Sequence, residues 1–359
     1  PYVQKFSLGF QKSIGAGFVL SSDYVHTLGL HESRVQVINP QIRSVCDPGF
    51  SGSTPTSPQC VRGAATRLLD RAFVDAGFPI AVAPGAPIAS GNARINQINM
   101  IGTTNRSLFD SWTTQLRGRF RRATFSVSYV LSDARSWGGQ PVASYTGNGI
   151  AIAPQNQFKP EEYGPTRFDE RHRIVASGVF ETPGGFQLSP IVQYSTARPY
   201  SLNAGIDVDG DGLTMIDRLC EGTDVQAVFN AVVRGQAIPA NARTPGCRQL
   251  AVNSQRTGFV VSRDAAGAVT GVEERSGRFI NIDLRVTKNI GITERVRIKA
   301  FADFYNLFNR ENLSLANRFG LSPVTAPRGF MQPVSLFGPG FGPPVGRPLT
   351  MQLGARIDF

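Results

Sequence analysis

The sequence has no long apolar run, and it contains few lysines. No uncharged apolar segment approaches the ~18–20 residues of a membrane-spanning helix, which excludes a helical integral membrane protein. Only five of the 37 Lys+Arg residues are lysines, and the arginines are scattered singly instead of being gathered in a basic tail. We therefore expect no nucleic-acid partner despite the formal net charge of +11. Scattered arginine better suits a surface that meets anionic lipid headgroups, or a lumen that selects anionic solutes.

Cysteine is also scarce, and its four copies form two local pairs. Cys46 and Cys60 lie in one Gly-, Pro- and Ser-rich stretch, and Cys220 and Cys247 lie in another. Neither spacing is that of a metal or redox motif. Because the two cysteines of each pair lie in the same stretch, we favour two loop-closing disulfides in an oxidising compartment. The alternative is that all four cysteines are unpaired and serve as small apolar side chains.

What the sequence does contain is strict alternation of apolar and polar residues. Ile280, Ile282, Leu284 and Val286, for example, alternate with polar residues, which is the period of a strand with two unlike faces. No segment shows the period of an amphipathic helix. The alternation predicts nine strands at Tyr2–Gln11, Gly15–Thr27, Phe109–Phe120, Ala123–Asp133, Arg171–Thr182, Phe186–Arg198, Arg278–Lys288, Val296–Tyr305 and Leu349–Phe359.

The connections between these strands alternate in length. The short ones are Lys12–Ile14, Arg121–Arg122, Pro183–Gly185 and Asn289–Glu294, and the long ones are Leu28–Leu108, Ala134–Glu170, Pro199–Gly277 and Arg310–Pro348. Such sorting is typical of an all-β, antiparallel transmembrane β-barrel with short periplasmic turns and long extracellular loops. A soluble antiparallel barrel or sandwich is the alternative, and there the apolar face would form the interior.

Four stretches in order along the chain carry a family resemblance. They are Ser126–Ala134 (SVSYVLSDA), Phe168–Arg173 (FDERHR), Asp207–Gly212 (DVDGDG) and Phe304–Asn312 (FYNLFNREN), and the chain ends in the aromatic Phe359. The chain resembles the C-terminal barrel portion of TonB-dependent outer-membrane receptors, in their Oar-like branch. The resemblance implies a Gram-negative outer-membrane location and TonB-coupled uptake of a large scarce solute that the outer loops bind. It also implies contact with lipid and lipopolysaccharide, and an assembly signal at Phe359 for the barrel assembly machinery.

The chain also departs from that family. No stretch matches the plug domain, its TonB-contacting segment or the carboxypeptidase-regulatory-like domain, so contact with TonB requires a plug outside these residues. The chain starts at Pro1 without a signal peptide, so we expect a mature product or a fragment. The resemblance implies a 22-stranded barrel, in which nine strands with the last running inward would be strands fourteen to twenty-two. A passive porin-like channel or an adhesin is the alternative function.

One acidic stretch has part of a calcium-loop spacing. Asp207, Asp209 and Asp211 occupy its first, third and fifth positions, but Arg218 stands where an EF-hand has glutamate. Asp217 could supply a late carboxylate. The two interpretations are a Ca²⁺ site and a solvated acidic turn, and we expect no other cofactor.

The remaining polar candidates favour structure over catalysis. His26, His31 and His172 have no ligand spacing, and no nucleophile motif such as G-x-S-x-G occurs, so we expect no enzyme activity. We expect Asp283 and Asp303 to form a ladder of ion pairs across neighbouring strands on the polar face. The alternative is that this face lines the lumen for an anionic solute. We expect five aromatic residues at the two bilayer interfaces: Tyr24, Trp112, Tyr129, Phe304 and Phe308.

Overall fold

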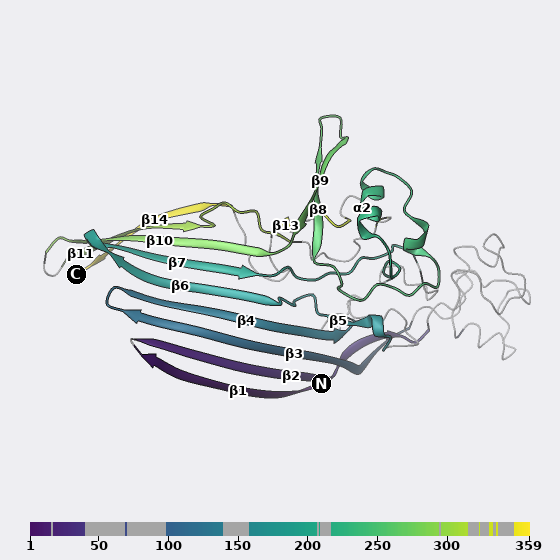
Figure 1. Ribbon diagram of the computed structural model, residues 1–359, viewed down its shortest axis with the longest axis horizontal. Helices are drawn as coiled ribbons and strands as arrows, with labels where there is room; N and C mark the ends of the chain where they lie inside the picture. Colours follow the sequence, from purple (N-terminus) through teal and green to yellow (C-terminus); the bar gives the residue numbers. More distant parts are fainter. Residues whose placement is uncertain are drawn as a thin grey trace, which may run out of the picture.

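Most of the molecule is one antiparallel sheet whose strands follow one another in chain order (Figure 1). In this computed structural model the path of the sheet runs β1-β2-β3-β4-β6-β7-β10-β11-β14, and the short β5 pairs with the end of β4. The structure describes residues 1–15, 17–39, 69, 98–138, 158–206, 208, 217–293, 296–314, 323, 330–332, 335–336 and 348–359.

The strands of the sheet are β1 (Tyr2–Gly15), β2 (Phe18–Val37), β3 (Asn99–Phe120), β4 (Ala123–Trp137), β5 (Tyr163–Pro165), β6 (His172–Thr182), β7 (Phe186–Ser195), β10 (Phe279–Gly291), β11 (Arg297–Tyr305) and β14 (Thr350–Asp358). The remaining elements are the 3-10 turns η3 (Pro160–Glu162), η4 (Pro183–Gly185) and η5 (Ala240–Arg243), the helix α2 (Val225–Val233), and the strand pairs β8 (Thr257–Arg263) with β9 (Val269–Ser276) and β12 (Leu313–Ser314) with β13 (Ser335–Leu336).

All nine predicted strands are present, but three predictions about their boundaries and about helices are wrong. The first turn lies between Gly15 and Phe18 instead of at Lys12–Ile14, because Ser13 still pairs with Val19 across the hairpin. The predicted loop Leu28–Leu108 begins too early and ends too late, because β2 and β3 continue pairing as far as Val37 and Asn99. The expected absence of helix is also wrong, since α2 forms within the loop Pro199–Gly277.

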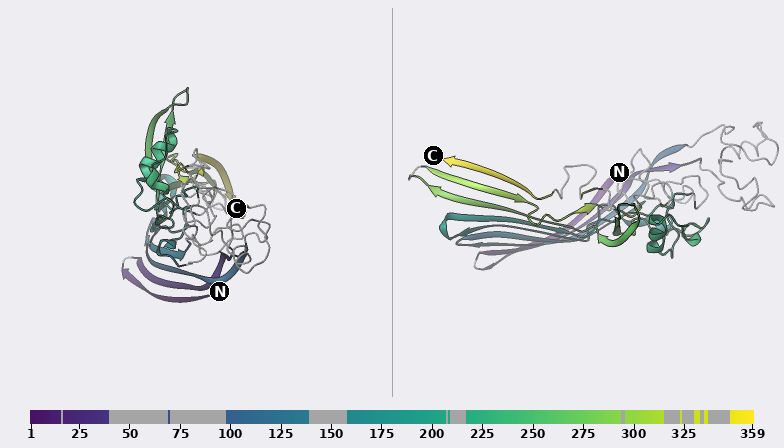
Figure 2. Two further views of the ribbon diagram at one scale, coloured as in Figure 1. Left: turned by 90° about the vertical axis from the view of Figure 1, so that its right-hand side faces the viewer. Right: turned by 90° about the horizontal axis from the view of Figure 1, so that it is seen from above.

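Short and long connections lie at opposite ends of the sheet (Figure 1). The hairpins at Arg121–Arg122 and Pro183–Gly185 are at the end where the chain terminates, and the long connections are at the end where it starts. We call these the turn end and the loop end. Seen along its strands, the sheet curves into an open trough (Figure 2), and β1 and β14 form its two edges.

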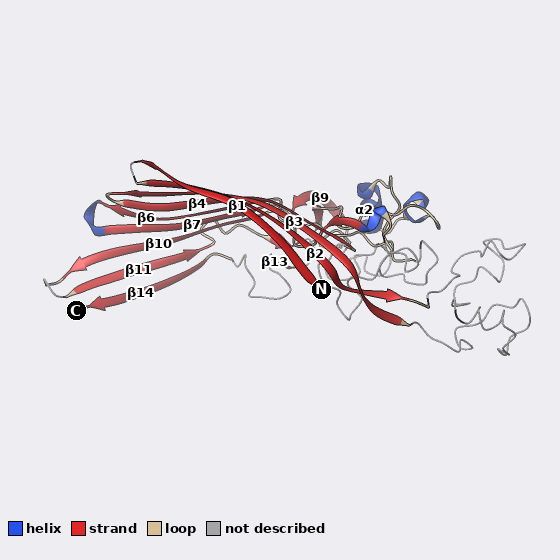
Figure 3. Ribbon diagram, turned by 90° about the horizontal axis from the view of Figure 1, so that it is seen from below, coloured by secondary structure: helices blue, strands red, loops and turns tan. Residues whose placement is uncertain are grey.

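A second, smaller unit lies at the loop end (Figure 3). It contains α2 and the β8–β9 hairpin, which projects away from the sheet in Figure 1. We call it the loop domain. Its core holds the most deeply buried apolar side chains of the described residues: Leu202, Ala204, Val208, Leu219, Val228, Phe229, Ala242 and Phe330. Asp224 caps α2 by accepting a hydrogen bond from the backbone amide of Ala227 at 3.0 Å. Within the described residues, no helix is long and apolar enough to cross a membrane.

Candidate functional site at the loop end

The register of the sheet sorts its side chains onto two unlike faces. Tyr24 of β2, Trp112 of β3 and Leu131 of β4 are register partners and therefore share one face. The neighbouring positions Asp23, Thr113 and Val130 share the other. Continuing this register across all strands gives an apolar face and a polar face. The apolar face includes Phe6, Leu8, Leu20, Trp112, Val127, Leu131, Ile174, Val192, Leu284, Ile298, Leu353 and Ile357.

Large residues of the apolar face are open to the surroundings. On the central strands β3 and β4, Trp112 is 56% exposed and Leu131 37%, although a soluble barrel or sandwich would bury this face. On β3 the face extends from Phe120 to Asp110, and ten residues span about 33 Å along a strand. At a tilt of about 40° this corresponds to a height of roughly 25 Å, which is that of a lipid-facing barrel band.

A polar row ends the apolar face towards the loop end. His26, Asp110 and Asp133 are register partners on β2, β3 and β4, so they lie at one level. The Asp110 carboxylate accepts a hydrogen bond from the Tyr24 hydroxyl at 2.6 Å and lies 2.8 Å from Nδ1 of His26. Tyr129, two same-face positions below Asp133 on β4, has its hydroxyl 2.8 Å from Nδ1 of His172 on β6. The aromatic residues Tyr24, Trp112 and Tyr129 thus lie at the polar edge of the apolar face, as an interfacial girdle requires.

The stretch FDERHR connects this row to the loop domain. The buried Asp169 accepts a hydrogen bond from the backbone amide of Ala134 at 2.9 Å and one from Arg256 at 2.5 Å. Arg171 forms an ion pair with Asp133 at 3.0 Å. These contacts fix the start of β6 against the end of β4 and against a loop about ninety positions later in the chain. They leave an open cavity of about 370 Å³ among Asp133, Asp169, Arg135, Arg171 and Arg256.

The stretch FYNLFNREN forms a turn held by asparagine side chains. Asn306 and Asn309 have φ of 51° and 47°, left-handed values that asparagine tolerates better than most residues. The Asn309 side chain accepts a hydrogen bond from the backbone amide of Leu349 at 3.0 Å. The buried Asn312 side chain bonds both the amide and the carbonyl of Ile280, each at 2.9 Å. This motif therefore joins β10, β11 and the start of β14.

On the polar face, Asp303 and Asp283 have different roles. Asp303 accepts two hydrogen bonds from Arg285 of the neighbouring strand, at 2.5 and 2.8 Å. Lys299 and Asp358 make a further cross-strand ion pair at 2.7 Å. Asp283 instead accepts from the side chain of Asn281 and from the backbone amide of Asn306. The predicted ladder thus includes Asp303, whereas Asp283 supports the asparagine turn because that turn brings an amide within 2.8 Å.

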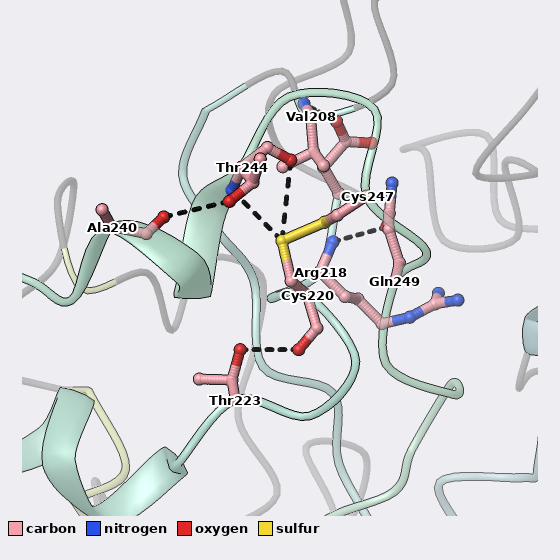
Figure 4. Close-up of a disulfide and its surroundings, with 9 residues drawn as sticks. Val208, Arg218, Cys220, Thr223, Ala240, Thr244, Cys247 and Gln249 are labelled. Carbon is pink, nitrogen blue, oxygen red and sulfur yellow. Dashed lines mark hydrogen bonds between the residues drawn. A yellow bond between two sulfur atoms is a disulfide. The ribbon is translucent and has the colours of Figure 1, made fainter.

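A disulfide joins Cys220 to Cys247, one of the two pairs expected from locality (Figure 4). It closes a segment of sequence separation 27 that contains α2 and η5. Around it, the Thr223 hydroxyl donates to the carbonyl of Cys220 at 2.6 Å, and the amide of Arg218 donates to the Gln249 side chain at 2.7 Å (Figure 4). The other expected pair, Cys46 and Cys60, lies outside the described residues.

The structure places only one of the predicted calcium ligands. Asp207, Asp209 and Asp211 lie outside the described residues. Asp217 is fully buried in the loop domain, where its carboxylate accepts a hydrogen bond from the backbone amide of Val208. Among the described residues, no three His, Cys, Asp or Glu side chains are arranged as a metal site. A calcium site in this loop stays a prediction.

Hydrogen bonds attach the loop domain to the sheet. The Arg218 side chain donates to the carbonyl of Glu161 in η3 at 3.0 Å, and the Asn253 side chain donates to the carbonyl of Pro165 in β5 at 2.8 Å. Burial raises the pKa of the Tyr200 phenol, which keeps it a neutral donor to the carbonyl of Thr257 at 2.5 Å. The loop domain is consequently a fixed extension of the sheet.

The last two sequence candidates are placed but not assigned a role. His31 has a left-handed φ of 54° on β2, and its ring centroid lies 5.4 Å from that of Tyr2. Phe359 follows β14 and is 98% exposed, and its role as an assembly signal stays a prediction. Of the remaining expected girdle residues, Phe304 lies on the apolar face opposite Met351, and Phe308 is 72% exposed in the asparagine turn.

The chain is similar to a solved structure and to a family model. The chain is similar to the crystal structure of the outer membrane transporter YddB from Escherichia coli, with 9% identity and a TM-score of 0.42. The similarity covers 87% of this chain and 29% of that one, so the chain spans less than a third of that transporter's length. No curated protein matches the chain. A family model described as the outer membrane beta barrel domain matches residues 1–334. The chain therefore belongs to the outer membrane beta barrel domain family, and its apolar face is the surface that meets the lipid of the outer membrane.

Proposed function

We propose that this chain supplies C-terminal barrel strands of a TonB-dependent receptor of the Oar-like branch, which takes up a large scarce solute. The observation that carries the proposal is the loop domain. A channel that only admits small solutes needs no folded extracellular unit, whereas a receptor needs a rigid surface that binds its solute before transport. Here a disulfide, a capped helix and a buried apolar core give the loop end such rigidity.

The motif residues support this assignment without taking part in transport themselves. The stretches FDERHR and FYNLFNREN hold the loop end of the sheet in one arrangement through Asp169, Asn309 and Asn312. Energy would come from the TonB complex through a plug domain outside these 359 residues, and the barrel assembly machinery would insert the strands. We assign no catalytic step and no nucleic-acid partner to the chain.

The proposal is tested by solute depletion in culture. The parent strain, a strain lacking the gene and a strain lacking TonB are grown in the same complex medium, and the medium is profiled by mass spectrometry. We expect at least one large solute to be depleted by the parent and by neither deletion strain. Depletion that continues without TonB would indicate a passive channel, and equal profiles in all three strains would favour an adhesin.

A matched pair of variants tests whether solute depletion requires the folded loop domain. Phe229→Ala removes a fully buried aromatic residue from its core, whereas Phe308→Ala removes one that is 72% exposed. Depletion should be lost with Phe229→Ala and kept with Phe308→Ala when both proteins reach the outer membrane at equal levels. Equal uptake by the two variants would show that the folded loop domain is dispensable.

A further inference from the structure

The cavity among the arginines opens at a defined height on the lipid side of the sheet. Leu131 is the last residue of the continuous apolar band on β4, and the charged Asp133 and Arg135 are the next two positions on that face. At 3.3 Å per residue they lie about 7 and 13 Å farther along the strand. Tyr129, at the polar edge of the band, is two residues below Leu131. The cavity therefore lies just beyond the hydrocarbon, at the level of the outer-leaflet headgroups.

Three guanidinium groups from distant parts of the chain meet in this cavity. Arg135 lies in the last three residues of β4, Arg171 precedes β6, and Arg256 comes from the loop domain. The Asp133 carboxylate holds Arg135 at 2.9 Å and Arg171 at 3.0 Å. Asp169, whose side chain is 1% exposed, holds Arg256 at 2.5 Å. The two carboxylates thus position the arginines, and three positive charges against two negative ones leave the group net positive.

The arginines keep part of their surface open. The exposed fractions of the Arg135, Arg171 and Arg256 side chains are 43%, 46% and 32%. A guanidinium has five N–H donors in a planar fork that matches phosphate oxygens, and the carboxylates occupy only some of them. An aspartate already orients each guanidinium group. Binding of a phosphate would therefore cost little additional side-chain conformational entropy.

We propose that this cavity binds a phosphate group of lipopolysaccharide in the surrounding outer leaflet. Position favours a lipid over a free solute, since Asp133 and Arg135 follow Tyr129 and Leu131 on the lipid-facing side of β4. An acyl chain could lie along Leu131 and Ile174 while the headgroup phosphate meets the arginines. The proposal depends on the outer-membrane location and is independent of whether the protein transports a solute.

The test measures binding of lipid A to the purified, delipidated full protein in detergent. Native mass spectrometry titrates the bisphosphorylated form and a dephosphorylated form of the same acylation. We expect the bisphosphorylated lipid to bind at least about tenfold more tightly, and Arg135→Gln combined with Arg171→Gln to remove that preference, as expected for lost charged hydrogen bonds. Arg275→Gln is the matched control, because Arg275 is equally exposed at 46% and paired with Glu273 at 3.0 Å, but lies on the β8–β9 hairpin.

Three results would overturn the proposal. They are equal affinity for the two lipids, an unchanged preference in the double variant, and an equal loss in Arg275→Gln. Binding of inorganic phosphate alone with the same arginine dependence, and without preference for lipid A, would assign the cavity to a free anion instead. The single variant Arg135→Gln at a strand end is measured in parallel, and a heat-modifiability gel checks that each protein is folded. We expect the single variant to lower the preference partially.

Discussion

The sheet and the loop domain place their apolar side chains in opposite directions. In the sheet, Leu8 and Leu353 are more than two-thirds exposed, whereas Leu219 and Phe229 of the loop domain are completely buried. The same kinds of residue therefore stabilise the two regions through different surroundings, lipid in one and protein interior in the other. Hydrophobicity alone does not tell which residues form a core.

The two regions also differ in how their contacts are arranged along the chain. In the sheet the strands pair in chain order, some across short turns, as β3 and β4 do at Arg121–Arg122, and some across long loops, as β7 and β10 do. The contacts of the loop domain follow no such order, because the amide of Phe259 donates to the carbonyl of Met331 at 2.8 Å and a disulfide joins Cys220 to Cys247. We expect damage in one region to leave the other intact, and four experiments test this expectation.

The largest effect should follow from deletion of Leu349–Phe359 in the full protein. β14 pairs with β11 along its whole length, so its removal leaves the backbone groups of β11 without partners in lipid, at several kcal/mol for each unsatisfied group. The truncated protein should be degraded or remain periplasmic in fractionation blots. Deletion of the β8–β9 hairpin is the control and should preserve insertion, since that hairpin forms a separate sheet. Normal outer-membrane levels after loss of β14 would refute the expectation.

Phe229→Ala should destabilise the loop domain by about 3–5 kcal/mol, because the ring is fully buried and stacks on Phe259 at 4.3 Å. Limited proteolysis should then cut within Pro199–Gly277, while the heat-modifiable band of the barrel is unchanged. Phe308→Ala should change neither readout by more than about 0.5 kcal/mol. A shift of the barrel band with Phe229→Ala would mean that the two regions unfold together.

Reduction of the Cys220–Cys247 disulfide should destabilise the loop domain by about 3–4 kcal/mol on the chain-entropy model, given its sequence separation of 27. Protease cutting between the two cysteines should increase and the strands should stay protected. Mass spectrometry of a non-reduced digest identifies the linked peptides. That digest also tests the expected Cys46–Cys60 pair, and a peptide linking Cys60 to Cys220 would contradict both pairings.

The smallest expected effect is the difference in stability between substitutions on the two faces of β11. Asp303→Leu removes two hydrogen bonds from Arg285 on the polar face and should cost about 1–3 kcal/mol. Ala302→Leu adds apolar surface to the lipid-facing side and should be near neutral. Heat-modifiability midpoints of the two variants provide the comparison. Equal midpoints, or a lower one for Ala302→Leu, would reverse the assignment of the faces.

The asparagine turn is a feature whose structural role could not be predicted from the sequence. FYNLFNREN carried the family resemblance, and the strand at its start is present, but its asparagines had no assigned role. Their function depends on Ile280 and Leu349, which are about thirty and forty positions away. The only sequence signal was the recurrence of asparagine, a residue that tolerates left-handed backbone and whose amide can replace a peptide group.

The sequence by itself determined the nine strands, their two faces and the sorting of loops, because an alternation of period two and the length of a turn are local properties of the chain. It missed α2, because a helix of nine residues repeats the helical period too few times to be recognised, and packing of Val228, Phe229 and Val233 into the core of the loop domain stabilises it. Only the tertiary structure decided the loop domain and the cavity of Arg135, Arg171 and Arg256. Both depend on which remote segments meet at the loop end, and no local period encodes such a meeting.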